Sequence, residues 1–124
     1  MAAASAVLYK ETGEQKYKAL TLAALRYLDL PIQDNGARYD VSGFQLPAEY
    51  VYNTPPIPNV RVLDGELIAS VATYSAARLL GDSSLLSLFQ RQAYSLSMQM
   101  DFYTRDSGRM LFATYVEEMP EHYM

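Results

Sequence analysis

A cluster of polar and aromatic residues lies near the centre of the chain. It consists of Glu49, Tyr50, Tyr52 and Asn53, within Leu46–Gly65, a segment that holds four of the six prolines. Proline fixes φ and lacks a backbone N–H, so this segment cannot form a helix or a central strand. Long loops inside compact domains are uncommon and often functional, so we expect these side chains to form a site.

Several of these residues also have a structural interpretation. Tyr50 and Tyr52 fit the anchoring of a loop as well as they fit chemistry, because a tyrosine has an apolar ring and a polar tip. Glu49 fits a solvated loop acid. Arg38, upstream of the loop, fits a salt bridge on a strand as well as a contact with a ligand.

Composition and charge argue against other kinds of site. The chain has no cysteine and a single histidine, His122, so we expect no metal site, no Ser-His-Asp site and no cofactor. The ten basic residues are scattered singly in a chain of net charge −4, which argues against nucleic-acid binding. No apolar segment approaches the roughly 20 residues that span a bilayer, and a signal peptide is not expected. The sequence does not indicate the cellular compartment.

Apolar periodicity and turn residues predict a mainly helical domain. Glycine and proline end the helical patterns, and alternation around Arg38 predicts a small β-hairpin. The expected helices cover residues 2–11, 14–29, 62–80 and 84–103. The expected strands cover 37–41, 44–46 and 109–117.

The helices differ in which face should be buried. In the second helix, Leu20, Ala24 and Tyr27 fall on one apolar face with their neighbours at helical spacing. The third helix is apolar around most of its circumference, which predicts burial on two sides. One of its faces is marked by Leu63, Leu67, Ser70, Val71, Tyr74 and Arg78.

Two helical hairpins, each followed by a polar and aromatic connection, indicate stacked helical pairs. We therefore expect a single domain, residues 1–124, that forms about two helical pairs of an α/α toroid. About six pairs close such a ring. This predicts a fragment of a larger domain, or a homo-oligomer formed through the apolar helix flanks.

Short motifs in this order resemble a known family. They are KETGEQKYKALTLAAL, NGAR at 35–38, AEY at 48–50, VLDG at 62–65 and DSG at 106–108. The series is similar to the C-terminal domain of D-glucuronyl C5-epimerase, which inverts C5 of glucuronate in heparan-type polysaccharides. The resemblance implies an α/α toroid that acts on a polysaccharide containing uronic acid.

The resemblance also implies a site. A catalytic tyrosine of the family lies in a Glu-Glu-Tyr-Pro segment, and the matching position is Tyr50. Val51 stands where the family has proline, so Tyr52 is a rival. A second tyrosine of the family corresponds to Leu111, and the nearest tyrosine is Tyr115. The expected catalytic residues are therefore Tyr50, Tyr52 and Tyr115.

Epimerisation at C5 removes a proton next to a carboxylate and returns one on the opposite face. Tyrosine has an ordinary pKa near 10, and a neighbouring cation lowers it. A cation beside the substrate carboxylate also stabilises the enolate-like intermediate. The residues expected to bind the substrate are Arg38, Glu49, Asn53 and Arg61.

Two other functions fit the same architecture. The first is a glycoside hydrolase or lyase, in which Glu49 would face Asp40 or Glu117 across a cleft. The second is a non-catalytic helical binding or scaffold module, in which the loop aromatics are platforms for sugar rings or a partner.

Overall fold

The computed structural model describes residues 1–41, 43–48, 63–100, 104–106 and 111–113. This part of the chain is mainly helical, as expected, with two short antiparallel sheets. Its four α-helices are α1 (Ala2–Thr12), α2 (Gln15–Asp29), α3 (Leu63–Leu80) and α4 (Ser83–Met98), and a 3₁₀ turn covers Ile32–Asp34.

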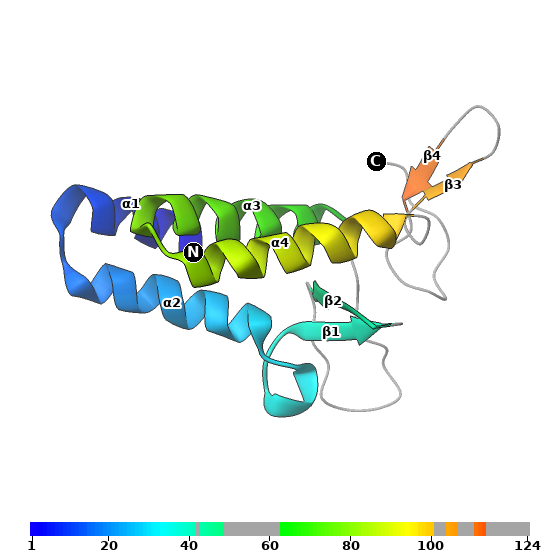
Figure 1. Ribbon diagram of the computed structural model, residues 1–124, viewed down its shortest axis with the longest axis horizontal. Helices are drawn as coiled ribbons and strands as arrows, with labels where there is room; N and C mark the ends of the chain where they lie inside the picture. Colours follow the sequence, from blue (N-terminus) through cyan, green and yellow to red (C-terminus); the bar gives the residue numbers. More distant parts are fainter. Residues whose placement is uncertain (42, 49–62, 101–103, 107–110, 114–124) are drawn as a thin grey trace.

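The helices form two antiparallel hairpins with tight turns. Gly13 has φ 71° and closes α1 by donating its N–H to the Tyr9 carbonyl. Gly81 has φ 64°, and the carboxylate of Asp82 then caps α4 by accepting from the N–H groups of Ser84 and Leu85. Figure 1 shows α1 and α3 side by side and running in the same direction. Helices α2 and α4 also run in the same direction as each other. Two stacked helical pairs are thus present, and the described helices do not by themselves close a ring.

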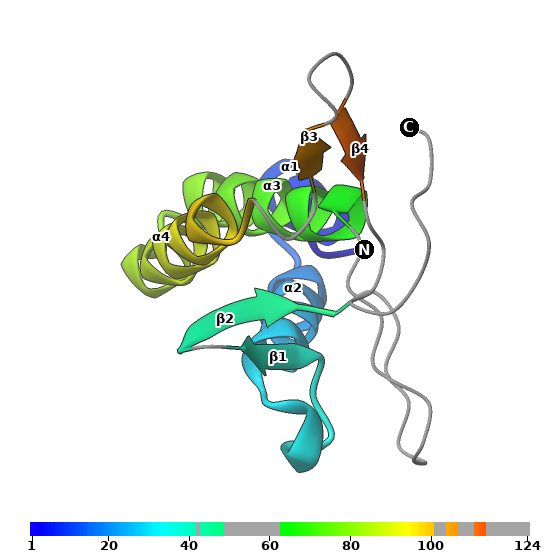
Figure 2. The ribbon, with the colours of Figure 1, turned by 90° about the vertical axis from the view of Figure 1, so that its right-hand side faces the viewer.

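The strands lie toward the end of the helices at which α3 begins and α4 ends (Figure 1), with the two strands that come first in the chain on the opposite side of α3 and α4 from the two that come last (Figure 2). Strand β1 (Arg38–Val41) pairs with β2 (Phe44–Pro47), which confirms the expected hairpin. Pro47 ends the pairing opposite Arg38, at the edge of a two-stranded sheet where proline is tolerated. Gly36 allows the close approach of this turn to α2, because a Cβ there would overlap the Leu30 carbonyl.

The C-terminal elements differ in part from the prediction. The helix expected to reach residue 103 ends at Met98, where the Gln99 N–H bonds to the Leu96 carbonyl. A strand, β3 (Thr104–Asp106), pairs with β4 (Leu111–Ala113). The strand predicted at 109–117 is therefore confirmed at 111–113, and β3 was missed because pairing with a later segment decides its conformation.

The core has two parts. Alanines of α1 and α3 meet leucines of α2 and α4 in the larger part, and Leu46, Leu63 and Leu96 form the smaller part beneath β2. The buried members of the larger part are Ala2, Ala6, Leu25, Ala76, Ala77, Leu85 and Leu88. A hydrogen bond of 2.8 Å between the hydroxyls of Ser5 and Thr21 joins α1 to α2 inside this core.

The predicted face of α2 was right only in part, because Ala24 packs against the core but two of its other members do not lie there. Leu20 and Tyr27 are exposed, whereas Thr21 and Leu25 are completely buried. Thr21 can be buried because its hydroxyl donates to the Tyr17 carbonyl and also meets Ser5. Residue polarity alone therefore misassigned part of the core face.

Helix α3 is buried on two sides, as expected, by α1 and α4. The face that includes Leu67 and Val71 nevertheless points outward, and both side chains are exposed. The buried faces instead use small residues such as Thr73 and Ala76, which let the neighbouring helices approach closely.

Candidate functional site

The described part of the chain contains one residue of the predicted site, Arg38. The expected catalytic residues Tyr50, Tyr52 and Tyr115 lie outside the described residues. The same holds for the expected substrate-binding residues Glu49, Asn53 and Arg61 and for the alternative acid Glu117. Their roles stay predictions from the sequence.

Arg38 lies at the start of β1 and is surrounded by acceptors. Its Nε and Nη2 donate to the two carboxylate oxygens of Asp40 at 3.1 and 3.3 Å, and its Nη1 donates to the Asp29 carbonyl at 2.7 Å. Its side chain is 19% exposed. The guanidinium thus makes the salt bridge of the structural interpretation, and it also ties β1 to the end of α2.

Asp29 extends this contact to α4. Its Oδ1 lies 3.7 Å from Arg38 Nη1, and its Oδ2 accepts from Arg91 Nη2 at 3.2 Å. Arg91 also donates to Gln45 of β2 at 2.9 Å. We call the set Asp29, Arg38, Asp40, Gln45 and Arg91 the charged junction. It contains two acids and two bases, so its formal charges balance while it joins α2, α4 and the β-hairpin.

A small cavity of about 10 Å³ lies beside the charged junction and is lined in part by Asp29, Arg38 and Arg91. Gln92 lines it and is 3% exposed, and neither polar atom of its side chain has a hydrogen-bond partner among the residues that the structure describes. This space is close to that of a single water molecule and is too small for a sugar or a cofactor. A sugar or a cofactor therefore does not fit inside this space, and the role of Arg38 in substrate binding stays a prediction.

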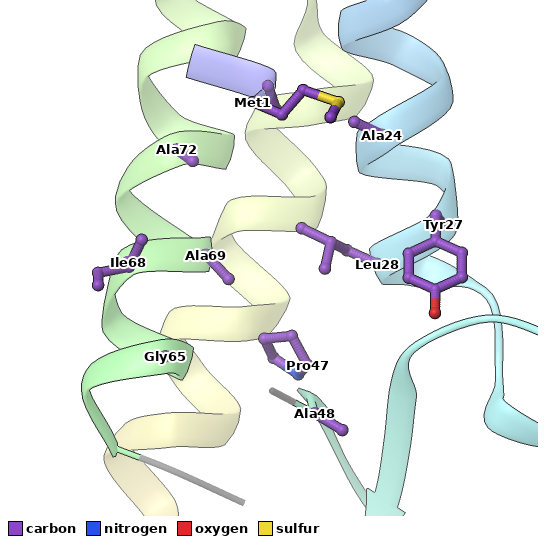
Figure 3. A pocket seen from close by; sticks show the side chains of 11 residues that line it. Met1, Ala24, Tyr27, Leu28, Pro47, Ala48, Gly65, Ile68, Ala69 and Ala72 are labelled. Carbon is purple, nitrogen blue, oxygen red and sulfur yellow. The ribbon is translucent and has the colours of Figure 1, made fainter. Parts of the chain in front are cut away.

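A larger groove lies on the other side of the hairpin, between α2 and α3 (Figure 3). Its volume is about 590 Å³, within the ~300–1,000 Å³ of typical small-molecule sites. Figure 3 shows Tyr27 and Leu28 on the wall formed by α2 and Ile68 on the wall formed by α3. The groove is mostly apolar, and its lining residues are Met1, Ala2, Ala24, Tyr27, Leu28, Pro47, Ala48, Gly65, Ile68, Ala69 and Ala72.

The groove adjoins the predicted loop at both ends of that loop. Ala48 lines the groove and is bonded to Glu49, and Gly65 lines it shortly after Arg61 in the sequence. The described residues on either side of the proline-rich segment therefore both reach this groove. Arg38 is not among the lining residues.

Tyr27 was expected to pack in the core, but 48% of it is exposed and it lines the groove. It is the aromatic side chain among the described lining residues. Its position near Pro31, where α2 must end, is the signal in the sequence that places it beside the connecting loops.

Glu66, in the first turn of α3, is completely buried. A carboxylate near a helix N-terminus interacts favourably with the helix dipole. Glu66 shares one side of α3 with Ser70 and Thr73, whose hydroxyls bond to the carbonyls one turn earlier. A single acid in a row of small polar residues at helical spacing was the signal for its burial.

Among the residues that the structure describes, no group of three His, Cys, Asp or Glu side chains is arranged to hold a metal ion. None of the described helices combines the length and the apolar character needed to cross a membrane. Comparison with protein-family models, with curated proteins and with solved structures finds no significant match to this chain. The resemblance to the epimerase family therefore rests on the short motifs alone.

Proposed function

We propose that this chain is a carbohydrate-active helical unit, similar to part of the D-glucuronyl C5-epimerase toroid, that takes a uronate-containing polysaccharide along the groove between α2 and α3. The observation that carries the proposal is the position of this groove. The chain enters the predicted loop at Ala48 and leaves it just before Gly65, and both residues line the groove.

The groove suits one face of a sugar ring. A pyranose presents C–H groups on its faces and hydroxyls at its edge, so it pairs with an apolar wall and an aromatic ring that has a polar tip. Tyr27 supplies such a ring, and Leu28 and Ala69 supply apolar wall. In this proposal Tyr27 is a sugar platform rather than a catalytic group.

The chemistry is assigned to residues 49–62. Tyr50 or Tyr52 takes the C5 proton, and a second acid, for which Tyr115 is the candidate, returns a proton on the opposite face. The electron pair left at C5 is delocalised into the carboxylate, and a cation stabilises it there. Arg38 already donates to Asp40 and to the Asp29 carbonyl, so Arg61 is the stronger candidate for this cation.

Binding tests the groove directly. We expect Tyr27→Ala to weaken the binding of a glucuronate-containing oligosaccharide by about 10-fold, the scale of one stacked ring at ~1.4 kcal/mol. The matched control is Tyr94→Ala on α4, which removes another exposed tyrosine that does not line the groove. Titration calorimetry or amide chemical shifts measure both. Equal binding by Tyr27→Ala and the wild-type chain would refute the groove as the sugar site.

Proton exchange tests the catalysis. In D₂O, the wild-type chain should incorporate deuterium at C5, and the Tyr50→Phe/Tyr52→Phe variant should lose this exchange. Tyr94→Phe is the matched control and should exchange as the wild type does. Unchanged exchange in the double variant would remove both tyrosines from the mechanism.

A second function is favoured by the apolar lining of the groove. None of the described lining residues has a charged side chain, and a binding module needs none. Sugar binding without deuterium incorporation at C5 would therefore identify a non-catalytic helical binding module.

A further inference from the structure

Helix α3 carries an outward-facing stripe, of which α4 covers only one side of Tyr74 through the ring of Phe89. Ile68 is 67% exposed, Val71 62%, Leu67 45% and Tyr74 43%. At 100° per residue these four side chains fall within about 60° of the direction of Val71, so they form one continuous apolar face. A row of large apolar residues on one side of a helix is typical of a surface that contacts another protein.

Charges of opposite sign stand at the two ends of this stripe. Asp64 lies seven residues before Val71 and Arg78 lies seven residues after it, and both are exposed. Seven residues are nearly two helical turns, so both charges point within about 20° of Val71. Val71 is also the midpoint in the sequence between Leu67 and Ser75, and between Ile68 and Tyr74. The stripe is therefore symmetric in position and opposite in charge about its centre.

We propose that this stripe is the contact surface of a homodimer in which the α3 helices of two copies pack antiparallel, with Val71 on the two-fold axis. A two-fold contact uses the same patch on both subunits, so the patch must complement itself. Antiparallel packing places Asp64 opposite the partner's Arg78, and Arg78 opposite the partner's Asp64. Parallel packing would instead place like charges together.

The geometry of helix pairs allows these contacts. Asp64 lies about 10.5 Å along the helix from Val71. At the common crossing angle of about 20°, the helix axes diverge sideways by only about 4 Å at that distance. A long arginine side chain spans this offset. A crossing angle near 50° would separate each Asp64–Arg78 pair further, so these charges favour the angle near 20°.

The contact is small, and this sets the expected strength of the dimer. Helix α3 is about 27 Å long, and one helix face covers less than the ~800 Å² per subunit of a standard interface. Val7 of α1 is 48% exposed and lies with Tyr74 along a neighbouring hollow, which extends the apolar surface. We expect a reversible dimer whose population depends on concentration. The dimer does not depend on what the groove binds, and the two surfaces share Ile68, which also lies on the groove wall.

A charge swap tests the proposal in the full chain. Sedimentation equilibrium should show a monomer–dimer equilibrium for the wild type. Asp64→Arg and Arg78→Asp each bring like charges together at both ends, so each should raise the dimer dissociation constant at least ~10-fold. The combined Asp64→Arg/Arg78→Asp variant should return it to within ~3-fold of the wild type. Far-ultraviolet circular dichroism checks that every variant is folded.

Three results would overturn the proposal. They are a wild-type chain that stays monomeric at every concentration, single variants that dimerise as the wild type does, and a swap variant that stays as weak as the single variants. The last result would indicate that the charges act on α3 itself.

The absence of cysteine provides a second test. A residue on a two-fold axis meets its own copy, so Val71→Cys should form a disulfide-linked dimer on mild oxidation. Met98→Cys is the control, because Met98 is similarly exposed at 55% but lies on α4. Cross-linking of Val71→Cys no faster than that of Met98→Cys would place another surface at the contact.

Discussion

On one side of Leu28 and Pro47 lies the charged junction, and on the other side lies the open groove. Both residues line both spaces, so a single wall separates a cavity of about 10 Å³ from a groove of about 590 Å³. The charged junction holds two arginines and two aspartates, whereas the described groove residues have no charged side chain.

The difference indicates that paired charges tie elements together in one region, while the other region keeps open apolar space. The carboxylates of Asp29 and Asp40 engage the guanidinium groups at the charged junction, which ties the hairpin to the helices. The groove has unfilled space and one exposed aromatic ring instead. Changes in the charged junction should therefore alter stability, and changes in the groove should alter binding.

Leu46→Ala should have the largest effect. Leu46 lines the cavity of the charged junction and is 1% exposed in the smaller core. Losing a buried leucine and leaving a cavity should lower the free energy of unfolding by about 2–5 kcal/mol. Urea unfolding followed by circular dichroism measures it. Ile68→Ala, at a 67% exposed side chain of the groove wall, is the matched control, and an equal loss there would remove the contrast between the two sides.

Asp29→Asn should come second. The change keeps the size of the side chain but removes the negative charge shared by Arg38 and Arg91. These contacts are partly exposed, so we expect a loss of about 1–2 kcal/mol of unfolding free energy. The loss should shrink at high salt, because ions screen exposed charges. No change in the urea midpoint would show that the charged junction does not hold the hairpin in place.

Asp82, the N-cap of α4, lines neither the groove nor the cavity of the charged junction, so it gives a reference for stability. Hydrogen bonds from the Ser84 side chain and from the N–H of Leu85 hold the pKa of Asp82 below its ordinary value. The unfolded chain therefore binds the proton more tightly, so the stabilisation is present above the ordinary pKa near 4 and is lost as the pH falls through the lower folded pKa.

Asp82→Ala should accordingly cost about 1 kcal/mol at neutral pH, the usual value of a helix cap. The difference from the wild type should disappear in acid. Thermal unfolding between pH 7 and pH 2 measures this, and a cost that is the same at every pH would contradict a role for the charged carboxylate.

Ala69→Leu should have the smallest effect on stability. Ala69 lines the open groove, so the added atoms have room and the unfolding free energy should stay within about 0.5 kcal/mol of the wild type. The same change should block the groove and abolish oligosaccharide binding. Retained binding in a stable Ala69→Leu chain would move the sugar site elsewhere.

Much of the local structure was predictable from the sequence. Gly13, Pro31 and Gly81 separate the helical patterns, and the alternation around Arg38 specifies the first hairpin. These signals act over a few residues and depend on backbone preferences. Strand β3 could not be predicted in the same way, because its partner β4 decides its conformation.

The location of the candidate site stays a prediction from the sequence. The proline-rich segment after the hairpin was expected to carry the site, and the groove adjoins both of its ends. The sequence could not assign Tyr27 to the groove, because exposed and buried tyrosines have the same helical spacing. The sequence also could not pair Arg38 with Asp29, because the two residues are nine positions apart and meet only through the way in which α2 leads into β1.

Short-range backbone chemistry made the order of the described helices and the first hairpin predictable from the residues alone. Which side chains are buried depends on which helices approach one another, so burial became clear only in the folded chain. Thr21 and Glu66 became buried, while Tyr27 and Val71 stayed exposed. The groove and the outward stripe of α3 are both consequences of that arrangement.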